Sequence, residues 1–296
     1  MGSDTIGRKD YSVGVRRVLV FTLILNSVVA LAKILYGYYT NSIAMTSDGF
    51  HSFFDGISNI VGLVGIWIAS HPPDERHPYG HKKFETLFTV IIGVMIFSTC
   101  FQILRKVYFS FSDNHRTIVT TTSFIIMLIT MGVNVLVMLY ESRKGKQLGS
   151  SFLVADALHT KSDIFASVAV IVSLMLTKAG YHYADTIVGI IITFFIARIG
   201  YKILKDASDV LVDSVCLDTS SIECVVNSVD GVKGCHEIRT RGPVNAVYVD
   251  LHVLVDKNLS AENAHRITEK VERGLKKEFP SIIDIIVHIE PETVQH

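Results

Sequence analysis

The sequence predicts an α-helical membrane protein with six transmembrane helices, followed by a small α+β domain. Three observations support this fold class. The 296 residues are 49% hydrophobic and 19% charged, with a mean hydropathy of +0.39, which is typical of chains with many membrane-spanning residues. Six apolar stretches reach the length of about 20 residues that a spanning helix needs. From about residue 207 the composition becomes that of a soluble domain.

The six apolar stretches are the predicted membrane helices, in chain order. The third and fourth contain uncharged runs, TLFTVIIGVMIFSTCFQIL and IVTTTSFIIMLITMGVNVLVMLY, which makes them the clearest spans. The second and fifth carry ionisable residues near their N-terminal ends. The polar start MGSDTIGRKDYSVGVRR continues into the first helix without a small-residue cleavage site, so this helix is expected to stay uncleaved. We place the helices at 14–38, 43–70, 85–109, 117–140, 152–177 and 184–204.

Basic residues indicate the orientation of the helices. By the positive-inside rule, both the N-terminus and the C-terminus are expected in the cytoplasm, and the compact loops favour a bacterial inner (plasma) membrane over an organelle membrane. Lys33 lies inside the first helix, and we interpret it as a side chain that extends toward the interface. The residues on the predicted cytoplasmic side are Arg8, Lys9, Arg16, Arg17, Arg76, Lys82, Lys83, Arg143, Lys144 and Lys146; the other side has mainly Arg116 and Lys178, with Arg105 and Lys106 near a helix end.

Residues 207–296 are expected to fold as a cytoplasmic domain after a transmembrane domain at 1–206. A short helix at 219–229, strands in KGCHEIRTRG and AVYVDLHVLVD, an amphipathic helix in SAENAHRITEKVERGLKKEF and a strand in IIDIIVHIEP give the order αββαβ. This order predicts a ferredoxin-like sheet with helices on one face. Because so small a domain has a thin core, a dimer or a bound metal would help to stabilise it.

Two of the predicted membrane helices each carry a histidine and an aspartate four residues apart. These pairs are His51 with Asp55, and His159 with Asp163; the spacing places each pair on one helix face. A charge at the bilayer centre costs at least ~2.5–3.5 kcal/mol, so the doubled pattern predicts a tetrahedral metal site, with zinc as the first choice. The alternative is that these groups lie at a membrane boundary. Asp48 is either a helix cap, a partner that orients His51, or a further ligand.

The loop between the second and third helices holds a second group, in HPPDERHPYGHKKFE. Asp74, His77 and His81 lie among prolines and a glycine, which can stiffen and turn the loop around one ion. The alternative is an ordinary solvated loop.

A third group lies in the C-terminal domain. His252 is on a predicted strand, His288 and Glu290 are two apart on the last strand and so share a face, and His265 is in the long helix. His236 is a further candidate, and the alternative is a set of scattered surface histidines. The sequence contains no HExxH, Walker phosphate loop or nucleophile elbow. The net charge of zero, without a basic stripe, indicates no nucleic-acid partner.

With HSFFD, HTKSD, DERHPYGHKKFE and the αββαβ order taken together, the chain resembles the cation diffusion facilitator family over essentially its whole length. The family consists of proton-coupled exporters of zinc and related metals. The resemblance implies homodimers formed through the C-terminal domains, with a charge contact between Lys83 and Asp213 that ties the membrane domains to the dimer joint. It implies a transport site of His51, Asp55, His159 and Asp163, a loop site of Asp74, His77 and His81, and a cytoplasmic-domain site of His252, His265, His288 and Glu290.

The chain departs from the family pattern at two places. Some bacterial members have an aspartate where His51 stands, and the histidine form is associated with a preference for zinc over cadmium. The sequence LKKEFP offers Lys276, Lys277 and Glu278 where relatives can have another histidine, which leaves a complete two-metal site there in doubt.

The donor set and the resemblance both imply proton-coupled transport. Metal binding needs neutral imidazole and ionised carboxylate, so protons and metal compete for one site, and alternating access would couple metal efflux to proton entry. Zn²⁺ is the expected cargo, Fe²⁺, Co²⁺, Ni²⁺ and Cd²⁺ are alternatives, and manganese ranks lower. Two other classes stay open. A sensor or scaffold would bind zinc without moving it, and an intramembrane metalloenzyme would need a general base beyond the ligands, for which the sequence offers no candidate.

Overall fold

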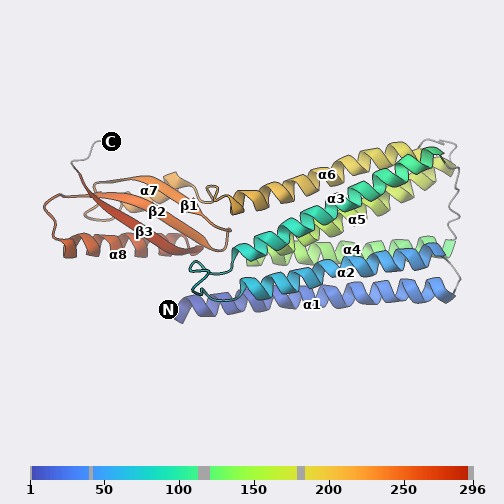
Figure 1. Ribbon diagram of the computed structural model, residues 1–296, viewed down its shortest axis with the longest axis horizontal. Helices are drawn as coiled ribbons and strands as arrows, with labels where there is room; N and C mark the ends of the chain where they lie inside the picture. Colours follow the sequence, from blue (N-terminus) through green and yellow to red (C-terminus); the bar gives the residue numbers. More distant parts are fainter. Residues whose placement is uncertain (1, 40–42, 113–120, 179–183, 293–296) are drawn as a thin grey trace. The chain divides into compact units, whose positions relative to one another are not determined.

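The structure is a computed structural model that describes residues 2–39, 43–112, 121–178 and 184–292, with the backbone alone at some positions inside the helices. The chain divides into two compact units, residues 2–207 and 208–296. The first unit is helical and the second contains a sheet (Figure 1).

Six long helices form the first unit within the described ranges. Four of them, α1, α3, α4 and α6, are apolar enough over a sufficient length to cross a membrane. In α2 the apolar segment among the described residues is Gly56–Ala69. The bounds are α1 (Gly2–Tyr39), α2 (Ile43–Ala69), α3 (Lys83–Ser112), α4 (Thr121–Leu148), α5 (Ser151–Lys178) and α6 (Ala184–Leu211).

Three of these helices extend well beyond their predicted bounds. The prediction begins the first helix at 14, whereas α1 begins at Gly2. The prediction ends the fourth helix at 140 and the sixth at 204, whereas α4 continues to Leu148 and α6 to Leu211. A hydropathy pattern detects only the part of a helix that crosses the hydrocarbon layer of the membrane. The helix hydrogen bonds continue into charged sequence such as ESRKGKQ, so helix length exceeds the span.

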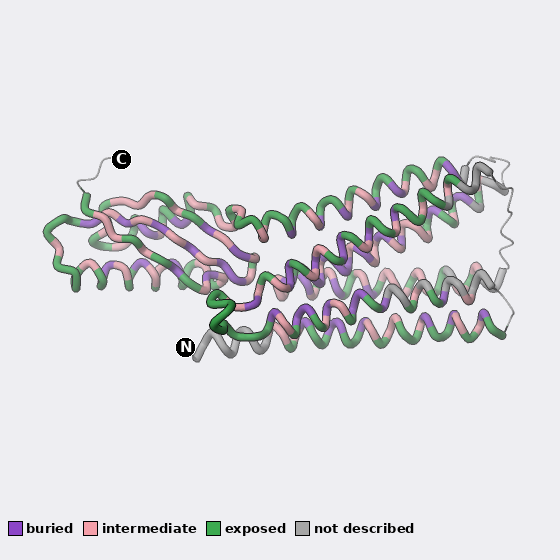
Figure 2. Tube along the Cα trace, in the orientation of Figure 1, coloured by how far each residue is buried: buried purple, intermediate pink, exposed green. Residues whose placement is uncertain are grey.

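The core of the helical unit is made of apolar side chains on the inward faces of the helices. Figure 2 shows buried residues recurring along the long helices, while large apolar side chains such as Ile24, Trp67 and Phe101 are exposed. Exposed apolar side chains on spanning helices are suited to contact with lipid. The central buried cluster includes Val15, Leu19, Ile66, Ile92, Ile96, Phe152 and Ile196.

α1 and α2 approach each other closely at two glycines. A Cβ atom built on Gly37 would lie 2.6 Å from the Thr46 backbone nitrogen, and one built on Gly49 would lie 2.8 Å from the Ile34 backbone nitrogen. Both distances are shorter than a carbon contact allows, so only glycine fits at either position. Small residues let membrane helices pack backbone against backbone, and here they hold α1 and α2 together.

Glu85 links three parts of the helical unit. It lies in the first turn of α3 and is 4% exposed. Its Oε2 accepts a hydrogen bond from the Tyr11 hydroxyl of α1 at 2.6 Å. Its Oε1 accepts from the Ser150 hydroxyl at 2.7 Å and from the Phe152 backbone N–H at 3.4 Å. A buried carboxylate with several donors is well stabilised, so Glu85 joins α1, α3 and the start of α5.

Lys33 does not extend to the membrane interface as the sequence analysis expected. It is 6% exposed, and its Nζ donates a hydrogen bond to the Ser52 hydroxyl of α2 at 2.9 Å. A buried ammonium group needs polar partners, and α2 supplies one at this level of the bundle. The interpretation of Lys33 as an interfacial side chain was therefore wrong.

The second unit has the predicted order αββαβ. Its elements are α7 (Thr219–Asn227), β1 (Gly234–Arg241), β2 (Val247–Val255), α8 (Ala261–Glu278) and β3 (Ile282–Pro291). β2 lies in the middle of the sheet, antiparallel to β1 and parallel to β3. Every second residue of β2 is buried. This face meets the buried side of α8, formed by Ile267, Val271 and Leu275.

Leu251 tests how much stability this thin core supplies. It is 1% exposed at the centre of β2, and we expect Leu251→Ala to destabilise the domain by about 2–5 kcal/mol, because the substitution leaves a cavity. Thermal unfolding of the purified protein measures the change. Ile286→Ala is the matched control, since Ile286 lies on β3 of the same sheet and is 52% exposed. Equal effects of the two substitutions would contradict this core assignment.

Candidate metal centres

A polar pocket lies between four helices of the first unit. α1, α2, α4 and α5 all contribute to its wall, and α5 contributes most. Asp156, His159 and Asp163 follow one another at spacings of three and four, so they share a face of α5. The lining residues are Asn26, Val29, Ser52, Ser58, Asn134, Asp156, His159, Thr160 and Asp163.

His159 is the most constrained side chain of this pocket. It is 4% exposed, and both of its ring nitrogens are buried without a hydrogen-bond partner among the described residues. Burying a polar group unpaired costs free energy. An imidazole held in this way beside a carboxylate, in a wall of amides and hydroxyls, is suited to binding a cation.

α2 is the second helix of the predicted transport site, and its backbone is described but the side chains of its three candidate residues are not. The side chains of His51, Asp55 and Asp48 lie outside the described residues. The backbone of all three belongs to α2. Ser52, the neighbour of His51, lines the pocket, so the segment of α2 that carries HSFFD borders the pocket of His159 and Asp163.

The loop between α2 and α3 brings Asp74, His77 and His81 together. Their ligand atoms all lie within 4.8 Å of one another. Asp74 Oδ1 is 3.1 Å from His77 Nδ1, and Asp74 Oδ2 is 3.4 Å from His81 Nε2. Gly80 has a positive φ of 83° and closes the turn through its N–H to the His77 carbonyl. These three groups could hold one metal ion.

Backbone hydrogen bonds within the loop stabilise the ionised form of the Asp74 carboxylate. The backbone N–H of His77 donates to Asp74 Oδ1 at 2.6 Å and that of Arg76 at 2.9 Å. These bonds, with the His77 N–H as the largest cause, lower the pKa of Asp74 below its usual value. Asp74 is therefore ionised at neutral pH, in the form that binds metal.

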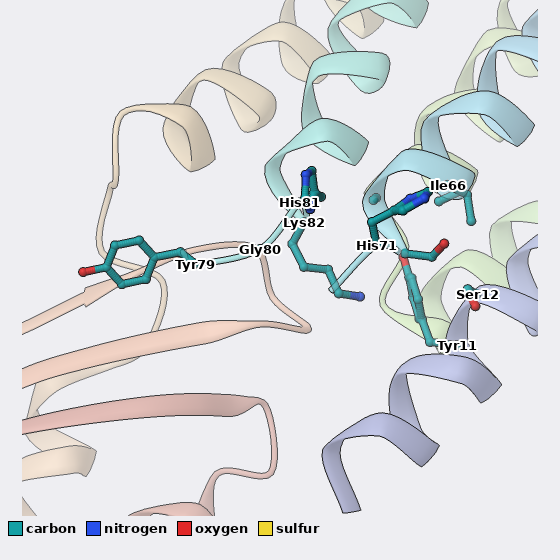
Figure 3. A pocket seen from close by; sticks show the side chains of 10 residues that line it. Tyr11, Ser12, Ile66, His71, Tyr79, Gly80, His81 and Lys82 are labelled. Carbon is teal, nitrogen blue, oxygen red and sulfur yellow. The ribbon is translucent and has the colours of Figure 1, made fainter. Parts of the chain in front are cut away.

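A small pocket lies beside the loop. Figure 3 shows that His71, just after α2, and His81, just before α3, line this pocket, with Lys82 directed toward Tyr11. Lys82 Nζ lies 4.2 Å from the centre of the Tyr11 ring. His81 is 9% exposed, and its Nδ1 is 3.2 Å from the Pro72 carbonyl oxygen. A backbone carbonyl at one ring nitrogen directs the other nitrogen toward a ligand.

The sheet of the second unit aligns three histidines across its strands. In the strand register His236 of β1 lies opposite His252 of β2, and His252 lies opposite His288 of β3. Glu290 follows on the same face of β3. His236 Nε2 is 3.0 Å from Glu290 Oε2, and His252 Nδ1 is 2.8 Å from Glu290 Oε1.

Glu290 is the centre of this cluster. Partial burial tends to raise the pKa of Glu290, but the hydrogen bonds from His252 and His236 outweigh it, and the pKa is lowered. His236, His252 and Glu290 have ligand atoms within 4.8 Å of one another. A carboxylate between two imidazoles is an established type of divalent metal site.

This cluster differs from the predicted ligand set. His288 lies at its edge, with Nε2 3.6 Å from Glu290 Oε1. His265 is not brought to the cluster by the described chain. Its side chain is 73% exposed on α8, and its Nε2 lies 3.7 Å from Glu269 Oε1 of the same helix. Among the described residues His236, rather than His265, lies with His252 and Glu290. The ligand set of His252, His265, His288 and Glu290 stays a prediction.

Replacing Glu290 should weaken metal binding at the sheet. We expect Glu290→Gln to lower the affinity of the cluster for zinc by about 10–100-fold, because the amide cannot offer a charged oxygen to the metal. Calorimetric titration of the purified protein measures this, with Glu292→Gln as the control because Glu292 is exposed outside the cluster. An unchanged affinity in Glu290→Gln would argue that no metal binds here.

The predicted charge contact is between the two units. Lys83 is the first residue of α3, and Asp213 follows α6 with a positive φ of 58°. The contact between them stays a prediction.

Comparison with known proteins identifies the family. The chain matches the cation efflux transmembrane domain over residues 19–212 and the cytoplasmic domain of cation efflux proteins over residues 217–292. The uncharacterized transporter MJ0449 of Methanocaldococcus jannaschii is 35% identical over 278 residues, which cover 93% of this chain and 98% of the relative.

Two relatives from other organisms have functional names. Metal tolerance protein C1 of Arabidopsis thaliana is 30% identical, over 90% of this chain and 60% of the relative. The manganese efflux system protein MneP of Bacillus subtilis is 27% identical, over 93% of this chain and 96% of the relative. The chain therefore belongs to the cation efflux, or cation diffusion facilitator, family of membrane transporters for divalent metal cations, and it is a transporter rather than an enzyme.

Proposed function

We propose that the protein exports zinc from the cytoplasm in exchange for protons, through a transport site of His51, Asp55, His159 and Asp163. The observation that carries this proposal is His159, a buried imidazole in a pocket that also contains Asp163. Neither of its ring nitrogens has a hydrogen-bond partner among the described residues. Two imidazoles and two carboxylates from α2 and α5 would complete a tetrahedral set, the geometry that zinc prefers.

Proton coupling follows from the donor chemistry. Imidazole binds metal in its neutral form and carboxylate in its ionised form, so a proton on either group opposes the metal. When the site faces the cytoplasm the metal displaces protons, and when it faces the other side the protons displace the metal. Alternating access of this kind converts a proton gradient into metal efflux.

Manganese is the second candidate cargo. The observation in its favour is the name of MneP, a manganese efflux system protein at 27% identity. Manganese prefers oxygen donors, whereas imidazole suits zinc. Because half of the proposed ligands are imidazoles, zinc is ranked first. Fe²⁺, Co²⁺, Ni²⁺ and Cd²⁺ are compatible with the same donors.

The remaining assignments complete the proposal. The protein would act as a homodimer in the inner (plasma) membrane with both termini in the cytoplasm, with domains at 1–206 and 207–296 and the Lys83–Asp213 contact between them. The match to the cytoplasmic domain of cation efflux proteins supports the dimer. The loop cluster of Asp74, His77 and His81 and the sheet cluster around Glu290 would bind further metal ions.

Metal flux into proteoliposomes tests the proposal. The native chain is reconstituted, a pH gradient is imposed, and the uptake of zinc, manganese, cadmium and iron(II) is compared. Zinc uptake that follows the gradient is the expected result. Binding of zinc without uptake would instead identify a sensor or scaffold, and uptake of manganese alone would replace zinc as the cargo.

A further inference from the structure

A second group of buried polar side chains lies next to the pocket of His159, and the transport site as proposed does not use it. Its centre is a pair of carboxylates, Glu141 of α4 and Asp156 of α5, which are 1% and 2% exposed. The two carboxylates interact electrostatically with each other. The Thr22 hydroxyl lies beside Glu141, and the Ser58 hydroxyl lies beside Asp156.

The pair is not fully satisfied by its described neighbours. Glu141 Oε2 is buried and has no hydrogen-bond partner among the described residues, and the same holds for Asn59 Nδ2. Asn59 is joined to this group through its Oδ1, which accepts from the Thr22 hydroxyl at 3.2 Å. Two neighbouring buried carboxylates are groups that a bound cation would stabilise.

Asp156 connects this group to the transport pocket. It lines the same pocket as His159 and Asp163. Along the axis of α5, Asp156 and Asp163 are separated by seven residues, or roughly 10 Å. Asp156 lies on the side of the pocket that is nearer to the junction of α4 and α5, since α5 begins at Ser151.

The donor set favours a hard divalent cation. Two carboxylates are present with hydroxyl groups beside them, and carboxylate oxygens bind hard divalent cations. Building on the proposed transport function, we propose that Glu141 and Asp156 form a second cation site, where the transported metal ion stops between the transport site and the membrane face at which α4 and α5 are joined.

Three variants test this second site in the full-length protein. Asp156→Asn and Glu141→Gln keep the shape of each side chain and remove its charge, and the double variant removes both. Asp206→Asn is the matched control, because Asp206 is an exposed carboxylate of α6. Zinc and manganese uptake into proteoliposomes is measured for each. We expect uptake to fall at least 10-fold in either single variant and to fall no further in the double variant, since two ligands of one site act as a unit.

Equilibrium binding separates the second site from the transport site. We expect the Asp163→Ala variant to bind one more zinc ion per chain than the double variant Asp163→Ala, Asp156→Asn. Equal stoichiometry in the two backgrounds would overturn the proposal. Normal uptake in both single variants would also overturn the proposal. Uptake that keeps its rate but loses its dependence on pH would overturn it as well, because Glu141 and Asp156 would then bind a proton instead of a metal ion. If the native chain moves no metal at all, the proposed transport function fails, and the stoichiometry in the Asp163→Ala background still tests the site.

Discussion

Asp163→Ala is expected to reduce metal uptake into proteoliposomes by on the order of 100-fold or more, while the protein remains folded. Loss even of a residue that supports a metal ligand typically costs 10–100-fold, and Asp163 is proposed to touch the metal directly. Its carboxylate lines the pocket of His159, so its removal would leave a single imidazole from α5. Uptake of zinc under a pH gradient is the measurement.

The matched control for this experiment is Asp206→Ala. Asp206 is also a carboxylate of a long helix in the first unit, but it is exposed and does not line the pocket. We expect native uptake in the control. Native uptake in Asp163→Ala as well would move the transport site elsewhere in the helical unit.

Glu85→Ala is expected to produce the largest loss of stability in the helical unit, about 3 kcal/mol or more. Three donors would lose their acceptor at once, namely the hydroxyls of Tyr11 and Ser150 and the backbone N–H of Phe152. A hydrogen bond to a charged group contributes about 1.5–3 kcal/mol, and donors left buried without a partner add a penalty. Thermal unfolding in detergent measures the change.

Two further variants define this effect. Glu75→Ala removes an exposed carboxylate from the loop before α3 and should leave stability unchanged. Tyr11→Phe removes one of the three hydrogen bonds to Glu85 and should cost less than Glu85→Ala. If Glu85→Ala unfolds at the same temperature as the native protein, the three hydrogen bonds do not hold these helices together.

Much of the fold could be predicted because its causes are local. Long apolar runs predicted the helices of the first unit. Apolar residues at every second position predicted strands such as β2, whose alternate residues are buried. The cap of α8 was also predictable, since Ser260 accepts from the Asn263 N–H. The loop cluster followed for the same reason, because Asp74, His77 and His81 lie within one short segment that prolines and a glycine shape.

The sheet cluster could be predicted only in part, because its membership depends on strand register. His236 and His252 are 16 residues apart, and only the pairing of β1 with β2 places them opposite each other. A bulge between His236 and Arg239 changes the register within β1, which a sequence pattern does not show. His265 shares a helix face with Glu269 instead, as a spacing of four on α8 allows.

The buried carboxylates of the helical unit were missed for a different reason. Glu141 lies beyond the predicted end of the fourth helix, where a charged residue suggests solvent. Asp156 had a usable signal, since it precedes His159 by three residues and so belongs to the same face of α5. Neither residue could be recognised as buried before the packing of α4 against α1 and α5 was known.

The glycine contacts between α1 and α2 have a mechanical consequence. Because α1 and α2 pack closely at Gly37 and Gly49, we expect the two helices to move together as one rigid body when α2 tilts. The pocket walls from Asn26 and Val29 would then travel together with those from Ser52 and Ser58, and α5 would move against both. A covalent cross-link between α1 and α2 should leave metal uptake intact, whereas a cross-link between α2 and α5 should abolish metal uptake.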